Sequence, residues 1–369
     1  MKLSVSKEDM MAGLQAVQSV VSSRPARPIL SNILIRAEDD VIELTGTDLD
    51  VSVICRINGK INEPGSITLP SRKFVGIIRE LQNSEIRLVV DEECMCSIQC
   101  GNSFFRLKGI DAVEYPVPDL LEMSQSLKIP QEAYRDMIRK TQYAISTDES
   151  RLILNGIYHS IADGKFTMVA TDGRRMAMVD REISEADELV VDAVVPNKAI
   201  SELSRLLDTS GEAAISFSET HIDYQLSGEG QNSVRILAKL VDGRYPNYRQ
   251  VIPKQVTHRI TLLREEFMLS LRRAEIMTSD KTNSVKMTFG GNLLTINANV
   301  PEVGEVRESL AIKFDEEEIT VAFNPSYLID PLKILDDDEV YFELLDQLSP
   351  GVLKINGAFL YVIMPMRVN

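Results

Sequence analysis

The stretch PNKAISELSRLL, residues 196–207, decides how the chain is organised. At 100° per residue its isoleucine and two of its leucines share one helical face, and Lys198 and Arg205 lie on the opposite face. An earlier stretch, PSRKFVGIIREL at residues 70–81, has the same plan. A third, residues 324–336, keeps the apolar face and one cation. The same pattern, an amphipathic helix with a basic outer face, therefore occurs three times in the chain.

Length and composition narrow the class of protein. With 369 residues the chain is long enough for two or three domains. It has no apolar run that would span a membrane, and its first residues lack the features of a signal peptide, so we expect a cytoplasmic protein. The net charge of −15 argues against a protein coated in nucleic acid, but it does not exclude one that concentrates its cations on a single surface.

The chain has few of the histidine and cysteine side chains that bind transition metals. The chain has three histidines and four cysteines, and Cys94, Cys96 and Cys100 fall on even positions of one strand-like run. A zinc site is one interpretation, but the spacing is not Cys-x-x-Cys and no histidine is near. The other is small apolar residues on one face of a strand in a reduced compartment. We favour the second and predict no metal and no cofactor.

Further matches extend the repeat. Residues 170–173 match residues 46–49, and residues 239–246 match the segment from 109 to 116. We predict an α+β fold of three tandem copies, each with two helices packed on antiparallel sheets and about eight strands. The predicted domains are residues 1–124, 125–253 and 254–369.

Local signals place several elements. Ser6 is expected to cap a helix, residues 29–35 to form a strand, and residues 131–145 to form a helix. Asn324 is expected to cap the last helix. Pro331 lies inside that helix, so we predict a kink there or a helix that restarts.

Four motifs resemble those of a known family. They are Asn32 with TGTDLD at residues 45–50, TDGRR at 171–175, LVDGRYPNYR at 240–249 and MPMR at 364–367. The sequence is similar in these motifs, in order and over its whole length, to the bacterial DNA polymerase III beta subunit, the DNA sliding clamp. The resemblance implies three DNA-clamp domains per chain and a head-to-tail homodimeric ring. Duplex DNA would pass through the ring without sequence-specific contacts.

The resemblance also implies partners and a role. A clamp loader would open the ring, and the clamp would act as a processivity factor that tethers the replicative DNA polymerase without being an enzyme. Sparse Lys and Arg residues on helices suit a protein that is attracted to DNA phosphates but makes no specific contacts with bases. The candidates for the DNA face are Arg72, Lys73, Arg79, Arg135, Arg139, Lys198, Arg205, Arg272, Arg273 and Lys333, with Arg24 from a matching family position.

A partner-peptide pocket is implied by the same motifs. In the family, the polymerase, the loader and other proteins dock a short peptide, roughly Gln-Leu-x-Leu-Phe, between domains two and three. The matching residues are Leu154, Thr171, Gly173, Arg174, Arg175, Met176, Pro246, Val251, Asn324, Tyr327, Val362, Ile363, Met364, Pro365, Met366 and Arg367. Arg175 and Arg367 would hold peptide carbonyls or an acidic residue. Alternatively, residues 360–364 are simply the last core strand. We expect both interpretations to hold, with alternate side chains of the strand serving the pocket and the core.

A ring interface is implied at two further places. The residues are Phe104, Phe105, Arg106 and Leu107 in the first copy, and Ile276, Met277, Glu302 and Glu305 in the third. Opposite charges beside an apolar patch suit a head-to-tail joint. The alternative is that Phe105 and Leu107 are ordinary core residues.

Two rival functions use other features. An enzyme would need Thr171-Asp172-Gly173, or Thr47-Asp48 with Asp50, as metal or phosphoryl ligands, but Asp-Gly is far more often a turn. No phosphate-binding loop, nucleophile elbow or histidine cluster accompanies them. A monomeric peptide-binding scaffold without DNA is the second rival, but it has no use for basic helix faces in all three copies.

Overall fold

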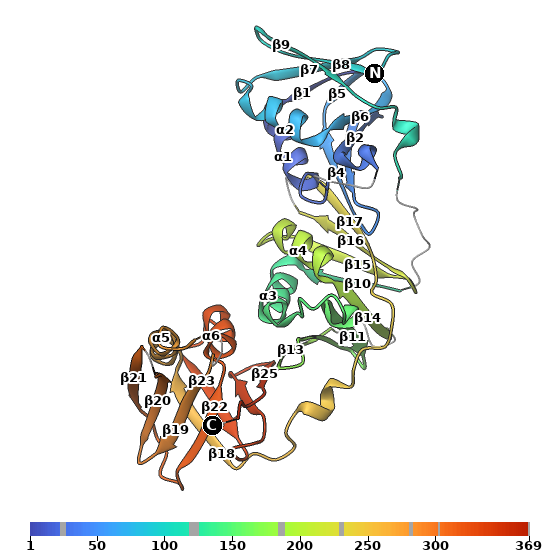
Figure 1. Cartoon of the computed structure of the whole chain (residues 1–369). Coiled ribbons are helices and arrows are strands. Elements are labelled where there is room, and N and C mark those ends of the chain that lie inside the picture. The colour runs from blue at the N-terminus through green and yellow to red at the C-terminus, as the bar shows by residue number, and fades with distance from the viewer. Residues whose placement is uncertain are drawn as a thin grey trace. The chain divides into compact units, whose positions relative to one another are not determined.

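The computed structural model describes residues 1–22, 27–117, 125–183, 189–228, 232–279, 283–301 and 303–367. The chain forms two compact units. The first comprises Met1–Arg135 and Lys198–Leu240, and the second comprises Asp136–Asn197 and Val241–Asn369. The elements of both are labelled in Figure 1.

Each of the three sequence copies supplies two α-helices, as the repeated pattern predicts. They are α1 (Lys7–Val17), α2 (Ser71–Glu80), α3 (Gln131–Thr141), α4 (Asn197–Leu206), α5 (Arg264–Glu275) and α6 (Pro325–Ile334). The predicted caps are confirmed: the Asp9 N–H donates to Ser6 Oγ, and the Ser326 N–H donates to Asn324 Oδ1, each at 3.0 Å. Within their units, α1 packs against α2 and α5 against α6 (Figure 1).

Antiparallel strands make up the rest of both units. The first unit contains β1 (Lys2–Ser6), β2 (Asn32–Glu38), β3 (Val41–Thr47), β4 (Val51–Asn58), β5 (Lys60–Glu63), β6 (Gly65–Pro70), β7 (Glu85–Val90), β8 (Met95–Cys100), β9 (Ser103–Lys108), β10 (Gln125–Pro130), β15 (Glu212–Phe217), β16 (His221–Ser227) and β17 (Ser233–Lys239). The second contains β11 (Gly156–Ala162), β12 (Lys165–Thr171), β13 (Arg175–Glu182), β14 (Val191–Pro196), β18 (His258–Leu263), β19 (Val285–Gly290), β20 (Leu293–Val300), β21 (Gly304–Ala311), β22 (Ile319–Phe323), β23 (Glu339–Leu344), β24 (Gly351–Lys354) and β25 (Phe359–Ile363).

The order of strands in the sheets shows the threefold repeat. One block of four strands occurs as β6-β2-β3-β4, β14-β11-β12-β13 and β22-β19-β20-β21. The other occurs as β1-β7-β8-β9, β10-β15-β16-β17 and β18-β23-β24-β25. Blocks from successive copies join edge to edge, β4 with β17 in the first unit and β13 with β25 in the second. The predicted α+β fold of three tandem clamp domains is thereby confirmed.

The helices bury the face that their apolar spacing predicts. Phe74, Val75 and Ile78 of α2 are buried, as are Ile200 and Leu203 of α4. The cations between them stay exposed on the opposite face. Each helix is therefore held by the hydrophobic effect on one side and leaves a charged surface on the other.

Three local predictions were wrong in part. Residues 29–31 are not strand, because Pro28–Ser31 forms a 3-10 helix and β2 begins at Asn32. The helix at residue 131 ends at Thr141, and Gln142–Ala144 is a separate 3-10 turn. Of the cysteines in the strand-like run, Cys96 and Cys100 are buried on one face of β8, whereas Cys94 lies in the preceding turn with φ 59°.

The last helix does not restart at its proline. α6 runs from Pro325 to Ile334 with Pro331 inside it. A proline at this position leaves the carbonyl oxygen of Tyr327 without its helical N–H donor. The hydroxyl of Tyr361 on β25 donates to that oxygen at 2.6 Å. A side chain from the neighbouring strand thus replaces the missing hydrogen bond.

Candidate nucleic-acid and peptide interfaces

The candidate cations of the DNA face fall into two groups. The ten that lie in described residues are all exposed, and Arg24 lies outside the described residues. Five of the ten form ion pairs with nearby carboxylates. The pairs are Arg139 with Asp136 and Asp336, Lys198 with Asp48, Arg205 with Glu202, Arg273 with Glu308, and Lys333 with Asp330. The other five, Arg72, Lys73, Arg79, Arg135 and Arg272, have no carboxylate within 4.0 Å among the described residues.

Arg205 has a structural task in addition to its charge. Its guanidinium donates to the carbonyl oxygens of Gln15 at 2.8 Å and Ala16 at 2.7 Å. These lie in the last turn of α1, where carbonyls lack helical donors. Arg205 therefore ties α4 to the end of α1, and little of its donor capacity is left for a phosphate.

The positions of Arg72 and Lys73 are unfavourable for the helix that carries them. Both lie in the first turn of α2, which contains no acidic residue. Cations there oppose the helix dipole, at a cost of roughly 0.3–1 kcal/mol each in exposed positions. No carboxylate in the described part of the chain offsets this cost, which is consistent with a ligand of opposite charge.

The Thr-Asp motifs form the same turn twice. In the second unit, Asp172 Oδ1 accepts the N–H groups of Arg174 at 2.8 Å and Arg175 at 3.0 Å, and Gly173 has φ 87°. In the first unit, Asp48 Oδ1 accepts two N–H groups in the same way, and Leu49 has φ 84°. Both carboxylates stabilise turns. No group of His, Cys, Asp and Glu in the described residues could hold a metal ion.

Arg175 is fixed inside the second unit. Its guanidinium donates to Asp172 at 3.0 Å, to Asp330 of α6 at 2.6 Å and to the Tyr143 carbonyl at 2.7 Å. It also lies 4.4 Å from the centroid of the Tyr327 ring. With its side chain only 10% exposed, it links β13 to α6.

The junction of β13 and β25 brings several predicted pocket residues together. Met176 pairs with Val362 across the two strands, and both belong to one buried cluster with Leu154. Ile363 is also fully buried, but it points to the other sheet face because side chains alternate along a strand. Asn324 uses its side chain to cap α6.

The rim of this cluster is accessible. Exposed there are Val251, Met364 and Met366, which are apolar, and Gly173, Arg174, Pro246 and Arg367. Thr171, Tyr327 and Pro365 are half-buried. Tyr158, Tyr245 and Tyr248 also belong to this cluster and were not predicted from the sequence. The rings of Tyr158 and Tyr245 stack with their centroids 4.7 Å apart. The tyrosines of the YPNY segment were the available signal.

The strands β9 and β21 each end a sheet within their units. On β9, Phe104 is 61% exposed and Phe105 is 39% exposed, which does not fit an ordinary core strand. Ile276, just after α5, is 77% exposed, and Met277 is half-buried beside Gly304. Arg106 and Glu305 are exposed, Leu107 is half-buried, and Glu302 lies outside the described residues.

Three copies of one α+β domain, joined edge to edge with exposed basic helix faces, define the DNA-clamp class. The chain belongs to the DNA polymerase III beta subunit family, since the models of its N-terminal, central and C-terminal domains match residues 1–120, 128–247 and 249–367. Sliding clamps of this family are non-catalytic processivity factors of DNA replication.

Individual members of the family are similar to this chain over its full length. The chain is 32% identical to the beta sliding clamp of Chlamydia muridarum, with 100% of both chains covered. It is similar to the crystal structure of the DNA polymerase III subunit beta from Pseudomonas aeruginosa, with a TM-score of 0.94, 31% identity and 100% of both chains covered. The Bartonella birtlesii sliding clamp bound to griselimycin gives a TM-score of 0.94 at 34% identity, again with 100% of both covered.

Proposed function

We propose that two copies of this chain close head to tail into a ring around duplex DNA and hold the replicative polymerase on it. One observation carries the proposal. Successive copies join by the same pair of edges, β4 with β17 and β13 with β25. By the repeat, the third such joint would pair β21 with β9, and these strands end separate sheets. Supplying this joint between two chains, twice, gives a closed twofold ring.

The chemistry of the two edges supports this joint. Unpaired edge strands attract other strands, and natural proteins protect them unless they are used. Neither β9 nor β21 carries a proline, and β9 exposes Phe104 and Phe105. Arg106 and Lys108 on β9 complement Glu305 and Glu308 on β21. Apolar contact with opposite charges at its border suits a specific interface.

The helix cations would contact phosphates without reading bases. Arg72, Lys73, Arg79, Arg135 and Arg272 are the strongest candidates because each is exposed without a carboxylate partner in the described part of the chain. Attraction to phosphates is independent of sequence, as sliding requires. The net charge of −15 means that the rest of the surface discourages other modes of DNA binding.

A partner peptide would dock at the β13–β25 junction and not at its counterpart. Met364 N–H donates to the Arg174 carbonyl at 2.9 Å, and Lys239 N–H donates to the Asp50 carbonyl at 2.9 Å in the same way. In the first unit, however, these positions carry a Lys239–Asp50 ion pair of 3.1 Å. The second unit has an exposed methionine instead, and flexible, polarisable side chains suit a surface for several partners.

We also propose domain boundaries after residues 124 and 253, a cytoplasmic protein, and no catalytic activity. The repeat of strand blocks supports the boundaries. No helix of the described residues is long and apolar enough to cross a membrane. Asp48 and Asp172, the best candidates for chemistry, already cap turns.

Retention on DNA of defined topology tests the ring. The clamp is assembled on a nicked circle with a loader and ATP, the circle is then linearised, and retained protein is measured by gel filtration. We expect retention on the circle and release after linearisation. Ile276→Asp should abolish retention on the circle. Protein that stays on linear DNA, or a chain that is monomeric at micromolar concentration, would favour a direct grip on DNA or the monomeric scaffold.

A further inference from the structure

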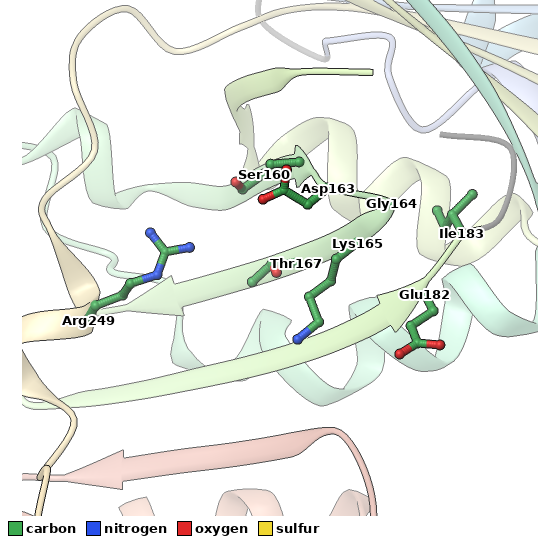
Figure 2. A pocket seen from close by; sticks show the side chains of 9 residues that line it. Ser160, Asp163, Gly164, Lys165, Thr167, Glu182, Ile183 and Arg249 are labelled. Atoms are coloured by element: carbon green, nitrogen blue, oxygen red, sulfur yellow. The ribbon is translucent and has the colours of Figure 1, made fainter. Parts of the chain in front are cut away.

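The polar face of the sheet formed by β11, β12 and β13 carries two adjoining hollows. One has a volume of about 580 Å³ and the other about 390 Å³. Both are lined by Lys165, Thr167 and Arg249, so they form one continuous depression, here called the sheet-face groove. Figure 2 shows the larger hollow, with Arg249 entering from one end and Glu182 at the other.

The half of the groove nearest Arg249 is positively charged. Its single carboxylate, Asp180, is already engaged by Lys165 at 3.0 Å and by the Thr167 hydroxyl at 2.8 Å. Arg249 lies 4.9 Å from the centroid of the Tyr248 ring, and Lys254 lines the same hollow. Two cations therefore remain without a carboxylate partner among the described residues. A guanidinium held on a ring presents its N–H groups in a fixed fork, which matches a carboxylate.

The wall of the same half is apolar and reaches the proposed peptide pocket. Met178 and Ile252 line it, and both pack against the cluster that contains Met176 and Val362. Val251 of the pocket rim directly precedes Ile252. The groove thus shares wall residues with the side-chain cluster of the proposed pocket, and it offers a cationic side and an apolar side to a peptide that extends from the pocket.

We propose that the sheet-face groove binds the residues that flank a partner's docking motif, an extended segment that places an acidic side chain against Arg249 and Lys254. This rests on the proposed function, because the same peptide occupies the pocket and continues into the groove. Charge selects the segment: an acidic flank gains two charge-assisted contacts, and a neutral flank gains none. The pocket would recognise the motif, and the groove would rank partners by their flanks.

Fluorescence anisotropy with three labelled peptides tests this. Each contains Gln-Leu-Ser-Leu-Phe, alone, with Glu-Glu-Glu added at both ends, or with Gln-Gln-Gln added at both ends. At 50 mM salt we expect the Glu peptide to bind about fivefold more tightly than the Gln peptide, the gain of exposed ion pairs. The gain should fall as salt rises.

Variants separate the groove from general attraction. Arg249→Gln with Lys254→Gln should remove the gain and leave the Kd of the Gln peptide unchanged. Lys60→Gln with Arg87→Gln, two exposed cations in the first unit, should keep the gain. Equal affinity of the Glu and Gln peptides, or loss of the gain in the control variant, would overturn the groove. Failure of all three peptides to bind would instead overturn the pocket. Displacement of only the Glu flank by millimolar inorganic phosphate would assign the groove to a small anion.

Discussion

Replacing Tyr361 by phenylalanine should destabilise the second unit, although the aromatic side chain itself stays buried. The Tyr361 hydroxyl donates at 2.6 Å to the carbonyl oxygen that Pro331 leaves without a helical donor. The side chain is fully buried, and this burial raises the pKa of Tyr361, so the hydroxyl stays protonated and able to donate. In Tyr361→Phe the Tyr327 oxygen would lose this donor.

The size of the effect follows from the type of bond lost. Leaving one buried polar group without a partner costs about 1–3 kcal/mol. For a unit of this size, each kcal/mol lowers Tm by roughly 2–4 °C. We therefore expect Tm to fall by about 2–12 °C. Tyr143→Phe is the matched control, because the buried Tyr143 hydroxyl has no hydrogen-bond partner in the described residues and its removal should cost nothing.

A double-mutant cycle identifies the cause. In Pro331→Ala the residue regains an N–H that can reach the Tyr327 oxygen within α6. The cost of Tyr361→Phe should then shrink, and the coupling is read from urea and thermal unfolding followed by far-UV circular dichroism. If Tyr361→Phe costs no more than Tyr143→Phe, or costs the same with and without Pro331, the explanation of the interior proline is wrong.

Three further predictions concern charge, assembly and pH. Arg72→Ala with Arg79→Ala should weaken loading on DNA circles and reduce the salt slope of DNA binding by about 0.9 per lost phosphate contact, with an unchanged dimer. Ile276→Asp should give monomers in light scattering, whereas Val113→Asp, at a residue 90% exposed, should not. Burial lowers the pKa of His159 to about 4. Since the unfolded chain protonates near 6.5, stability should fall between pH 6.5 and 4, by up to about 3 kcal/mol, and His159→Gln should flatten that dependence of the urea midpoint.

Local chemistry made much of the fold predictable. The helices of the basic stretches are encoded within about ten residues by the spacing of apolar and charged side chains. The Ser6 and Asn324 caps depend on neighbours two or three positions away. The two errors near residues 29 and 142 are at element ends, where short 3-10 turns compete with longer elements at little energetic difference.

Contacts between distant residues were beyond a single sequence. The pairing of Met176 with Val362 joins strands that are far apart in the chain. Only the family resemblance placed these two residues in one pocket, because nothing in either strand specifies its partner. Arg205 was expected on the DNA face because its helical position is exposed, but its donors reach carbonyls of α1. Arg175 was expected to hold a peptide, and nothing in the sequence indicated the three internal acceptors to which its guanidinium donates.

If the helix cations face DNA as proposed, their division into paired and unpaired groups would let a ring stay on DNA and still move. Phosphate contacts each add to affinity and to its salt dependence, so a surface with every cation free would bind tightly in one place. Here half of the described candidates are paired with carboxylates such as Asp48 and Glu308, and these pairs lower the local positive potential. Of the five cations without a carboxylate partner among the described residues, three lie on α2, one on α3 and one on α5. Weak, spread attraction centres a duplex without holding it, and the closed ring, not the strength of any contact, would then determine how long the clamp remains on DNA.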